Sequence, residues 1–331
     1  MAFLYITEQG AVLRKAYRHL RLIKDKETLL EIPCADVEHV LIFGNIQVTT
    51  PALQSLARNN IELAFFSRRG KLLFQLTSRF PKNILLRQQQ YRKQADTSFC
   101  LGLSRVIVRA KLKSAADVLR GQRNNNPQFA CDEALKTIDR MQERARHGTS
   151  LKSLLGIEGA AAAAYYKAFG RIPKAPWTFD GRVRRPPRDP VNALLSFGYV
   201  IVANEIASLL DGIGFDPFLG FYHTVAYGRN SLALDLLEEF RHSLVDRLVL
   251  TILNRRILKP QHFAQTTRDG VHLTREGMQK FFKVYENYVG DYGDEATDKN
   301  VGYFRSHFKA QAHKLAATLQ TGAAYQPFQR R

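Results

Sequence analysis

The sequence contains few cysteines and only one tryptophan. Its three cysteines, Cys34, Cys100 and Cys131, lie far apart and form no CxxC pair. The sequence therefore favours neither a disulfide framework nor a thiolate zinc site, and it indicates a reducing compartment. A single Trp177 argues against the aromatic face of a membrane-binding amphipathic helix. Walker, HExxH and GxSxG motifs are also missing, so no common nucleotide-binding, zinc-protease or serine-hydrolase chemistry is indicated.

Signals for export or membrane insertion are also missing. The N-terminal segment MAFLYITEQG has neither a basic n-region nor a long apolar h-region. The most apolar later run, Phe197–Phe215, carries Asn204 and Glu205. It is expected to be a buried core helix and not a membrane span. The sequence thus predicts a cytoplasmic protein.

Basic residues are in large excess. Lys and Arg number 49 against 30 Asp and Glu, which gives a formal net charge of +19 and a pI of about 10.0. A charge of this size points to a polyanionic partner. Nucleic acid and an acidic membrane surface both fit, and the single tryptophan favours nucleic acid.

The sequence pattern changes from strand-like to helical near residue 82. Residues 1–80 contain short β-branched and aromatic runs separated by turn signals, with a short helix expected at Thr50–Asn60. The rest shows helical periodicity. The expected fold is α+β and multidomain. It has an N-terminal β-sandwich-like domain over residues 1–82, a larger all-α catalytic domain over 83–320 and a flexible tail over 321–331.

One proline-rich segment interrupts the helical sequence pattern. Arg171–Pro190 holds five of the twelve prolines and six basic residues, and proline keeps such a segment irregular. It is interpreted either as a solvated connector or as a basic loop that contacts phosphates. A later stretch, His262–Thr274, is expected to form a hairpin that turns at Asp269–Gly270. The DNA-binding candidates come from this segment and from Gly214–Leu248. They are Arg182, Arg184, Arg185, Arg188, Arg229 and Arg241.

The run LLGIEGAAAAAYY (Leu154–Tyr166) places one carboxylate in a helix of small residues. Glu158 lies between Gly156 and Gly159, and each glycine within a helix costs about 1 kcal/mol relative to alanine. Tight helix packing or the close approach of a ligand would both explain the small residues. Packing does not explain the acid, because an unpaired buried carboxylate is expensive. A cation is therefore expected to neutralise Glu158.

A second segment, Gly214–Leu248, carries further candidate ligands. Asp235 and Glu238 are three residues apart on a helix expected to run through Leu250, and so share a face. His223 lies just upstream. Carboxylates with one imidazole suit Mg²⁺ or Mn²⁺. The alternative is a structural histidine with acids in ordinary surface ion pairs, and spacing alone leaves both open.

Five motifs in sequence order resemble those of the CRISPR-associated integrase of spacer acquisition, the universal first protein of CRISPR adaptation. They are LLGIEGAAAAAYY, RPPRDPVNALLSFGY, GFDPFLGFYHTVAYGRNSLALDLLEEFR, LNRRILKPQHF and GVHLTREGMQKFFKVYE. The resemblance covers essentially the whole chain. It implies an N-terminal β domain that forms homodimers, and a helical domain. A small ferredoxin-like CRISPR-associated partner would join two such dimers in a heterohexamer.

The resemblance also implies a site and an activity. By motif position Glu158, His223 and Glu238 would be the catalytic and metal-binding residues for Mg²⁺ or Mn²⁺, with Asp235 as a possible assisting acid. The expected activity is insertion of short foreign duplexes into a CRISPR array by transesterification of 3′-OH ends, with an associated DNase activity. A structure-specific nuclease for branched DNA in repair and a non-enzymatic architectural DNA binder are the alternatives.

Overall fold

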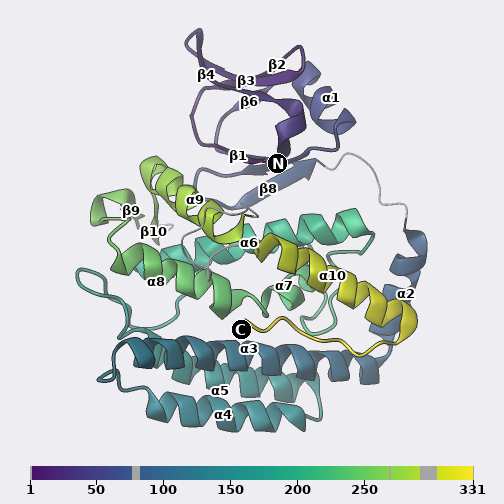
Figure 1. Ribbon diagram of the computed structural model, residues 1–331, viewed down its shortest axis with the longest axis vertical. Coiled ribbons are helices and arrows are strands. Elements are labelled where there is room, and N and C mark those ends of the chain that lie inside the picture. The colour runs from purple at the N-terminus through teal and green to yellow at the C-terminus, as the bar shows by residue number, and fades with distance from the viewer. Residues whose placement is uncertain (1, 77–82, 268–269, 291–303, 331) are drawn as a thin grey trace. The chain divides into compact units, whose positions relative to one another are not determined.

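The computed structural model describes residues 2–76, 83–267, 270–290 and 304–330. The chain divides into two compact units (Figure 1). The first comprises Met1–Phe80 and Leu273–Phe282, and the second comprises Pro81–His272 and Lys283–Arg331. The expected boundary at residue 82 falls in 77–82, outside the described residues.

The first unit is built from two four-stranded sheets. One has the strand order β1-β5-β7-β8, with β1 and β7 parallel to β5, and the other has the order β4-β3-β2-β6. A helix, α1, connects β6 to β7. The elements are β1 (Ala2–Ile6), β2 (Val12–Ala16), β3 (His19–Lys24), β4 (Glu27–Pro33), β5 (Val37–Phe43), β6 (Gln47–Val48), α1 (Thr50–Arg58), β7 (Glu62–Phe66) and β8 (Leu72–Leu76).

Both sheets and α1 contribute to one hydrophobic core. Its members include Ile6 from β1, Leu13 from β2, Val40 from β5 and Leu56 from α1, each at most 2% exposed. Burying apolar side chains from two sheets against one another is what stabilises a sandwich. The expected α+β architecture, with a strand-rich N-terminal region followed by a helical domain, is confirmed.

Ten residues expected in the helical domain belong to the first unit. Within Leu273–Phe282, the ring of Phe282 stacks on Tyr5 at 4.0 Å between centroids, and Arg275 Nη1 lies 2.6 Å from Glu8 Oε2. Aromatic stacking of this kind adds to simple area burial. These contacts explain why the segment joins strands that are distant in sequence.

The second unit is predominantly helical. Its helices are α2 (Ile84–Ala95), α3 (Thr97–Asn125), α4 (Asp132–Arg146), α5 (Leu151–Phe169), α6 (Pro190–Ile213), α7 (Ser231–Leu237), the π-helix η2 (Arg241–Asp246), α8 (Arg247–Asn254) and α10 (Phe304–Thr321). The helix α9 (Arg275–Val289) begins in the first unit and ends in the second. The hairpin expected at His262–Thr274 is present as β9 (Phe263–Thr266) paired with β10 (Gly270–Leu273). Asp269, expected at its turn, lies outside the described residues.

Two features of the second unit frame the candidate site. Helices α3, α4 and α5 lie side by side (Figure 1), with α3 contacting both others. Helix α6 is long and apolar enough to cross a membrane by length and composition, but 67% of its most apolar window is buried inside the protein. This fits the core helix expected from the sequence.

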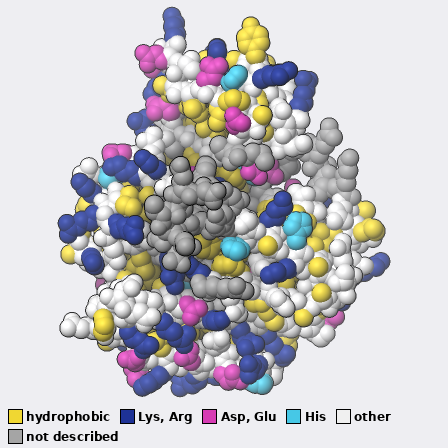
Figure 2. Space-filling view, in the orientation of Figure 1, with side chains coloured by type: hydrophobic (Ala, Val, Ile, Leu, Met, Phe, Trp, Pro, Cys, Tyr) yellow, Lys and Arg dark blue, Asp and Glu magenta, His cyan; other side chains and the backbone are white. Residues whose placement is uncertain are grey.

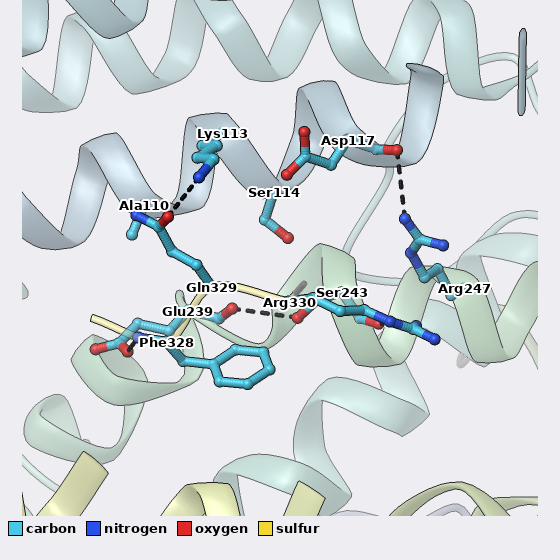
Figure 3. Close-up of a pocket in the computed structure, with 10 residues that line it drawn as sticks. All are labelled: Ala110, Lys113, Ser114, Asp117, Glu239, Ser243, Arg247, Phe328, Gln329 and Arg330. Atoms are coloured by element: carbon cyan, nitrogen blue, oxygen red, sulfur yellow. Dashed lines mark hydrogen bonds between the residues drawn. The ribbon is translucent and has the colours of Figure 1, made fainter. Parts of the chain in front are cut away.

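The C-terminal segment differs from the expected flexible tail. Residues 322–330 follow α10, and the last three of them, Phe328, Gln329 and Arg330, line one cavity with side chains of α3 and η2 (Figure 3). The phenyl ring of Phe328 stacks on Phe240 at 4.9 Å, and the Tyr325 hydroxyl donates to Glu239 Oε1 at 2.5 Å. Two aromatic side chains with buried partners outweigh the chain entropy that would keep the segment free.

Candidate active site

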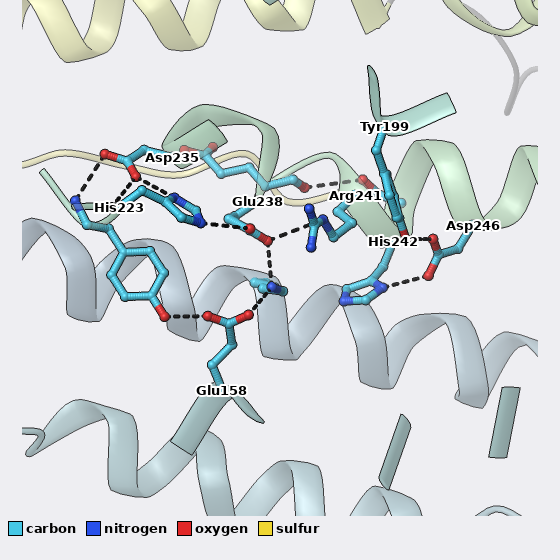
Figure 4. A network of polar contacts seen from close by, with 12 residues as sticks. Glu158, Tyr199, His223, Asp235, Glu238, Arg241, His242 and Asp246 are labelled. Carbon is cyan, nitrogen blue, oxygen red and sulfur yellow. Dashed lines mark hydrogen bonds and ion pairs between the residues drawn. The ribbon is translucent and has the colours of Figure 1, made fainter. Parts of the chain in front are cut away.

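Glu158 lies in the middle of α5 and faces α3. Ser150 caps the helix by accepting a hydrogen bond from the Ser153 amide at 3.1 Å. One carboxylate oxygen of Glu158 accepts a hydrogen bond from the Tyr222 hydroxyl, and the other accepts one from the ammonium of Lys111 (Figure 4). The expected neutralising cation is therefore present, and it is a lysine of this chain.

Gly156 and Gly159 are not explained by helix packing. Both are exposed, and a Cβ atom placed on either would meet no atom within 4 Å. Of the two reasons considered for the small residues, packing is thus wrong for the glycines. Open space remains on this side of α5.

His223 is oriented by Asp235. One Asp235 oxygen, Oδ1, accepts both the His223 amide and His223 Nδ1 at 2.8 Å. The other, Oδ2, accepts the amides of Phe221 and Tyr222 at 2.6 and 3.0 Å. With Nδ1 engaged, Nε2 of the same ring points toward Glu238 Oε1 at 3.7 Å. Asp235 thus fixes the loop and the imidazole at once.

The helix expected to run through Leu250 is interrupted. Helix α7 ends at Leu237, hydrogen bonds from i to i+3 tighten the chain over Glu238–Phe240, and η2 then widens it. Leu232, Leu236, Leu237 and Phe240 are buried, as expected for core positions. The changed winding directs the adjacent acids Glu238 and Glu239 to different partners, and π-turns of this kind occur frequently at functional sites.

Lys111 joins the two predicted acidic ligands. Its ammonium lies 2.5 Å from Glu158 Oε1 and 2.6 Å from Glu238 Oε2, and its side chain is only 4% exposed. Arg241 approaches Glu238 Oε2 from another side, with Nε at 3.5 Å. The structure therefore brings Glu158 and Glu238 together on one buried ammonium, with His223 next to Glu238.

The surroundings shift the protonation of two groups in opposite senses. Burial alone would raise the pKa of Glu238, but the charges of Arg241, Lys111 and His223 outweigh it and hold that pKa well below its usual range. Burial and the nearby Glu158 carboxylate raise the pKa of Tyr222. Glu238 is thus an anion, and Tyr222 is a hydrogen-bond donor.

The donor set fits a divalent cation only if Lys111 moves. Two carboxylates and an imidazole match Mg²⁺ or Mn²⁺, and Glu238 Oε2 is buried without a well-directed hydrogen bond. As the side chains stand, no group of three or more His, Cys, Asp or Glu residues among those described is arranged to hold a metal ion. Between the two carboxylates, the ammonium of Lys111 fills the place of a cation.

The DNA-binding candidates separate into two groups. Arg184, Arg185 and Arg188 are exposed, and Arg229 is half-buried. Arg184 lines a cavity of about 500 Å³ beside α5, together with Lys167 and Arg171. Figure 2 shows Lys and Arg side chains gathered over the helices α3 to α5 with fewer acids among them.

The other two candidate arginines are half-buried and contact protein groups. Arg182 donates to Val183 O, Asn192 Oδ1 and Ser196 Oγ at 2.8 to 2.9 Å, and Arg241 lies over the Tyr199 ring at 4.4 Å. Their guanidinium groups engage protein partners, and their assignment to DNA binding stays a prediction.

A second buried network lies next to the site (Figure 4). Asp246 accepts hydrogen bonds from Tyr165, at 2.7 Å, and from Tyr199, and it pairs with His242 Nδ1 at 2.7 Å. Burial raises the pKa of Asp246, but the His242 charge and these hydrogen bonds outweigh it and lower the pKa overall. A network of this kind rigidifies α5, which carries Glu158, against α6 and η2.

Three important residues were missed by sequence reasoning. Lys111 lies on the apolar stripe of α3 between Ile107 and Ala115, and a lysine at such a position was the available signal. Tyr222 was visible only as part of the FYH motif. Glu239 is buried and accepts Phe328 N at 2.6 Å, and burial raises its pKa to about 7. Nothing in the local sequence separates Glu239 from Glu238.

The chain is similar to known proteins in both sequence and structure. The family model described as CRISPR associated protein Cas1 matches residues 4–287. CRISPR-associated endonuclease Cas1 1 of Thermus thermophilus is 32% identical over 98% of both chains. CRISPR-associated endonuclease Cas1 2 of Rhodospirillum rubrum is 34% identical over 85% of this chain and 84% of its own length. The solved structure of TM1797, a Cas1 protein from Thermotoga maritima, superposes with a TM-score of 0.84 at 25% identity, covering 99% of this chain and 100% of that one. The chain belongs to the Cas1 family of CRISPR-associated proteins.

Proposed function

We propose that this chain is a metal-dependent DNA integrase that inserts short foreign duplexes into a CRISPR array. The observation that carries the proposal is that Glu158 and Glu238 meet at one buried positive charge, with His223 beside Glu238. The net charge of +19 supports a DNA substrate. The endonuclease names of the relatives support phosphodiester chemistry at this site.

In the proposed reaction one phosphodiester is exchanged for another. The 3′-hydroxyl of the incoming strand attacks a phosphorus at the repeat boundary, and a new P–O bond forms. The bond to the 3′-oxygen of the target strand breaks, the attacking hydroxyl loses its proton and the leaving oxygen gains one. No covalent enzyme intermediate is required. With water as the nucleophile, the same site acts as a nuclease.

Glu158, His223 and Glu238 would hold Mg²⁺ or Mn²⁺, which stabilises negative charge on the reacting phosphate when bound. The chain's own groups orient these ligands. Asp235 directs His223 Nε2 toward Glu238, and Tyr222 donates to Glu158. Arg241 lies beside Glu238 and helps to keep that carboxylate ionised.

The proposed assembly has two kinds of protein contact. The chain would form a homodimer through its N-terminal unit. A small ferredoxin-like CRISPR-associated partner would bridge two dimers into a heterohexamer. Protospacer duplex and CRISPR repeat DNA are the proposed substrates.

The nature of the product tests the proposed function. The full chain is combined with its CRISPR-associated partner, a labelled duplex with 3′-OH ends and a plasmid carrying repeats. Joined strands are expected with Mn²⁺ or Mg²⁺ and are expected to disappear with a chelator. Cleavage of branched DNA without partner or repeat would instead identify a repair nuclease. Undiminished joining in chelator would refute the metal requirement.

The exposed and internal arginines should differ in salt dependence. Arg184→Ala is expected to reduce the slope of log affinity for duplex DNA against log salt by about one unit, because one phosphate contact is lost. Arg182→Ala should leave that slope unchanged and lower the melting temperature, because its hydrogen bonds are internal. Fluorescence anisotropy at several salt concentrations measures both. Equal slope changes for the two variants would contradict the assignment.

A further inference from the structure

Lys111 has an unusual environment for a lysine. Its position on α3 belongs to the stripe of buried residues that faces α5 and η2, and its ammonium is shielded from solvent. Lysine is rarely buried unless it is paired. Here the partners come from two elements, α5 and the turn after α7, and both partners are carboxylates. The ammonium therefore links segments that are eighty residues apart.

The other contacts leave one shared position between the two acids. The Tyr222 hydroxyl donates a hydrogen bond to Glu158 Oε2, and His223 Nε2 lies nearest to Glu238 Oε1. The remaining oxygens, Glu158 Oε1 and Glu238 Oε2, both face the Lys111 ammonium. Glu158 and Glu238 would hold a divalent cation through carboxylate oxygens, and one oxygen of each is already occupied by this ammonium.

The two cations cannot share that position. Mg²⁺ binds oxygen at about 2.0–2.1 Å, whereas the ammonium already stands 2.5 and 2.6 Å from the same atoms. An ammonium is a compact point charge on a flexible stem and can leave by rotating its side chain. A guanidinium such as that of Arg241, packed over Tyr199, is less easily displaced.

We infer that Lys111 is the resident counter-cation of the Glu158–Glu238 pair in the metal-free protein, and that a divalent ion binds by exchange for its ammonium. The inference rests on the proposed metal-dependent function. Lys111 preserves the site before loading by placing a positive charge between the two carboxylates. The same contact lowers metal affinity, because binding must first break both ion pairs.

Metal binding in the absence of DNA tests the exchange. Free Mn²⁺ is followed by electron paramagnetic resonance during titration of the full chain, its Lys111→Met and Lys111→Gln variants, and Lys152→Met as a control. Lys152 is an exposed lysine on the same helix as Glu158. Both Lys111 variants are expected to bind Mn²⁺ at least about tenfold more tightly than the unaltered chain, whereas Lys152→Met should not differ from it.

Thermal unfolding gives a second readout. In chelator, Lys111→Met should melt at a lower temperature than the unaltered chain, because the acid pair has lost its cation. Added Mn²⁺ should raise its melting temperature by more than it raises that of the unaltered chain. Lys111→Gln keeps a hydrogen-bond donor for the carboxylates and provides a folded variant if Lys111→Met does not fold.

The outcomes separate the two proposals. If the unaltered chain binds Mn²⁺ and the Lys111 variants bind it equally or more weakly, exchange is refuted while the metal site stands. If neither the unaltered chain nor any variant binds Mn²⁺, the proposed metal-dependent function fails, and the exchange fails with it.

Discussion

The His223→Ala substitution is expected to slow strand transfer by about 10³-fold or more while DNA binding is retained. It removes the imidazole whose Nε2 lies 3.7 Å from Glu238 Oε1. Each factor of ten in rate corresponds to about 1.4 kcal/mol, so this loss equals about 4 kcal/mol of transition-state stabilisation, a magnitude that metal catalysis supplies. Single-turnover joining assays at saturating DNA, with anisotropy for binding, measure both quantities.

Glu158→Ala and Glu238→Ala should show the same loss of strand transfer, because each removes one proposed ligand. A matched control is His147→Ala, whose side chain is 75% exposed at the end of α4. It should retain activity within about twofold. Normal joining by His223→Ala would show that the imidazole takes no part in catalysis, and the three-ligand assignment would then have to be abandoned.

The candidate acids could be found from the sequence because their signals are local. A single acid among small residues at Glu158 required a cation, and the structure supplies one. Helical spacing placed Asp235 and Glu238 near each other, and both contact the ring of His223. The sequence left open which cation neutralises Glu158, because the partner lies 47 residues away on another helix.

Elements that depend on tertiary context could not be predicted in this way. Strand β3 has no flanking glycine signal, and its turns use Tyr17, Asp25 and Lys26 at positive φ. Such conformations are uncommon for non-glycine residues. The interruption of the helix after Leu237 could not be predicted from the sequence either. It arises because Glu238 and Glu239 are both buried and contact different partners.

The C-terminal segment shows the same limitation. Its composition alone favours disorder, and only the folded groove supplies the ring of Phe240 and the carboxylate of Glu239. Gly270 is a contrasting case, because its need for glycine is local. Its φ is +69°, and a Cβ there would lie 2.1 Å from Pro187 O. A glycine at a turn was predictable, but the neighbour that requires it was not.

Asp235 is expected to matter through His223 and not as a direct ligand. Its carboxylate accepts four N–H groups, from three consecutive amides and from His223 Nδ1. Asp235→Asn keeps the size of the side chain but replaces one acceptor oxygen with an NH₂ donor. The N–H groups that this oxygen accepted then lose their hydrogen-bond acceptor. The expected result is a loss of about 10- to 100-fold in both Mn²⁺ affinity and strand transfer, as for residues that orient metal-binding histidines.

The ring tautomer distinguishes orientation from simple structural support. In the unaltered chain the proton is expected on His223 Nδ1, since Asp235 Oδ1 accepts there at 2.8 Å. Nitrogen-15 NMR of the labelled ring should report that tautomer, and Asp235→Asn should move the proton to Nε2. Asp216→Asn is the matched control, because Asp216 anchors the start of the same loop through Tyr91 and Phe218 without touching His223. An unchanged tautomer in Asp235→Asn, with metal affinity equal to that of the control, would show that Asp235 only supports the loop.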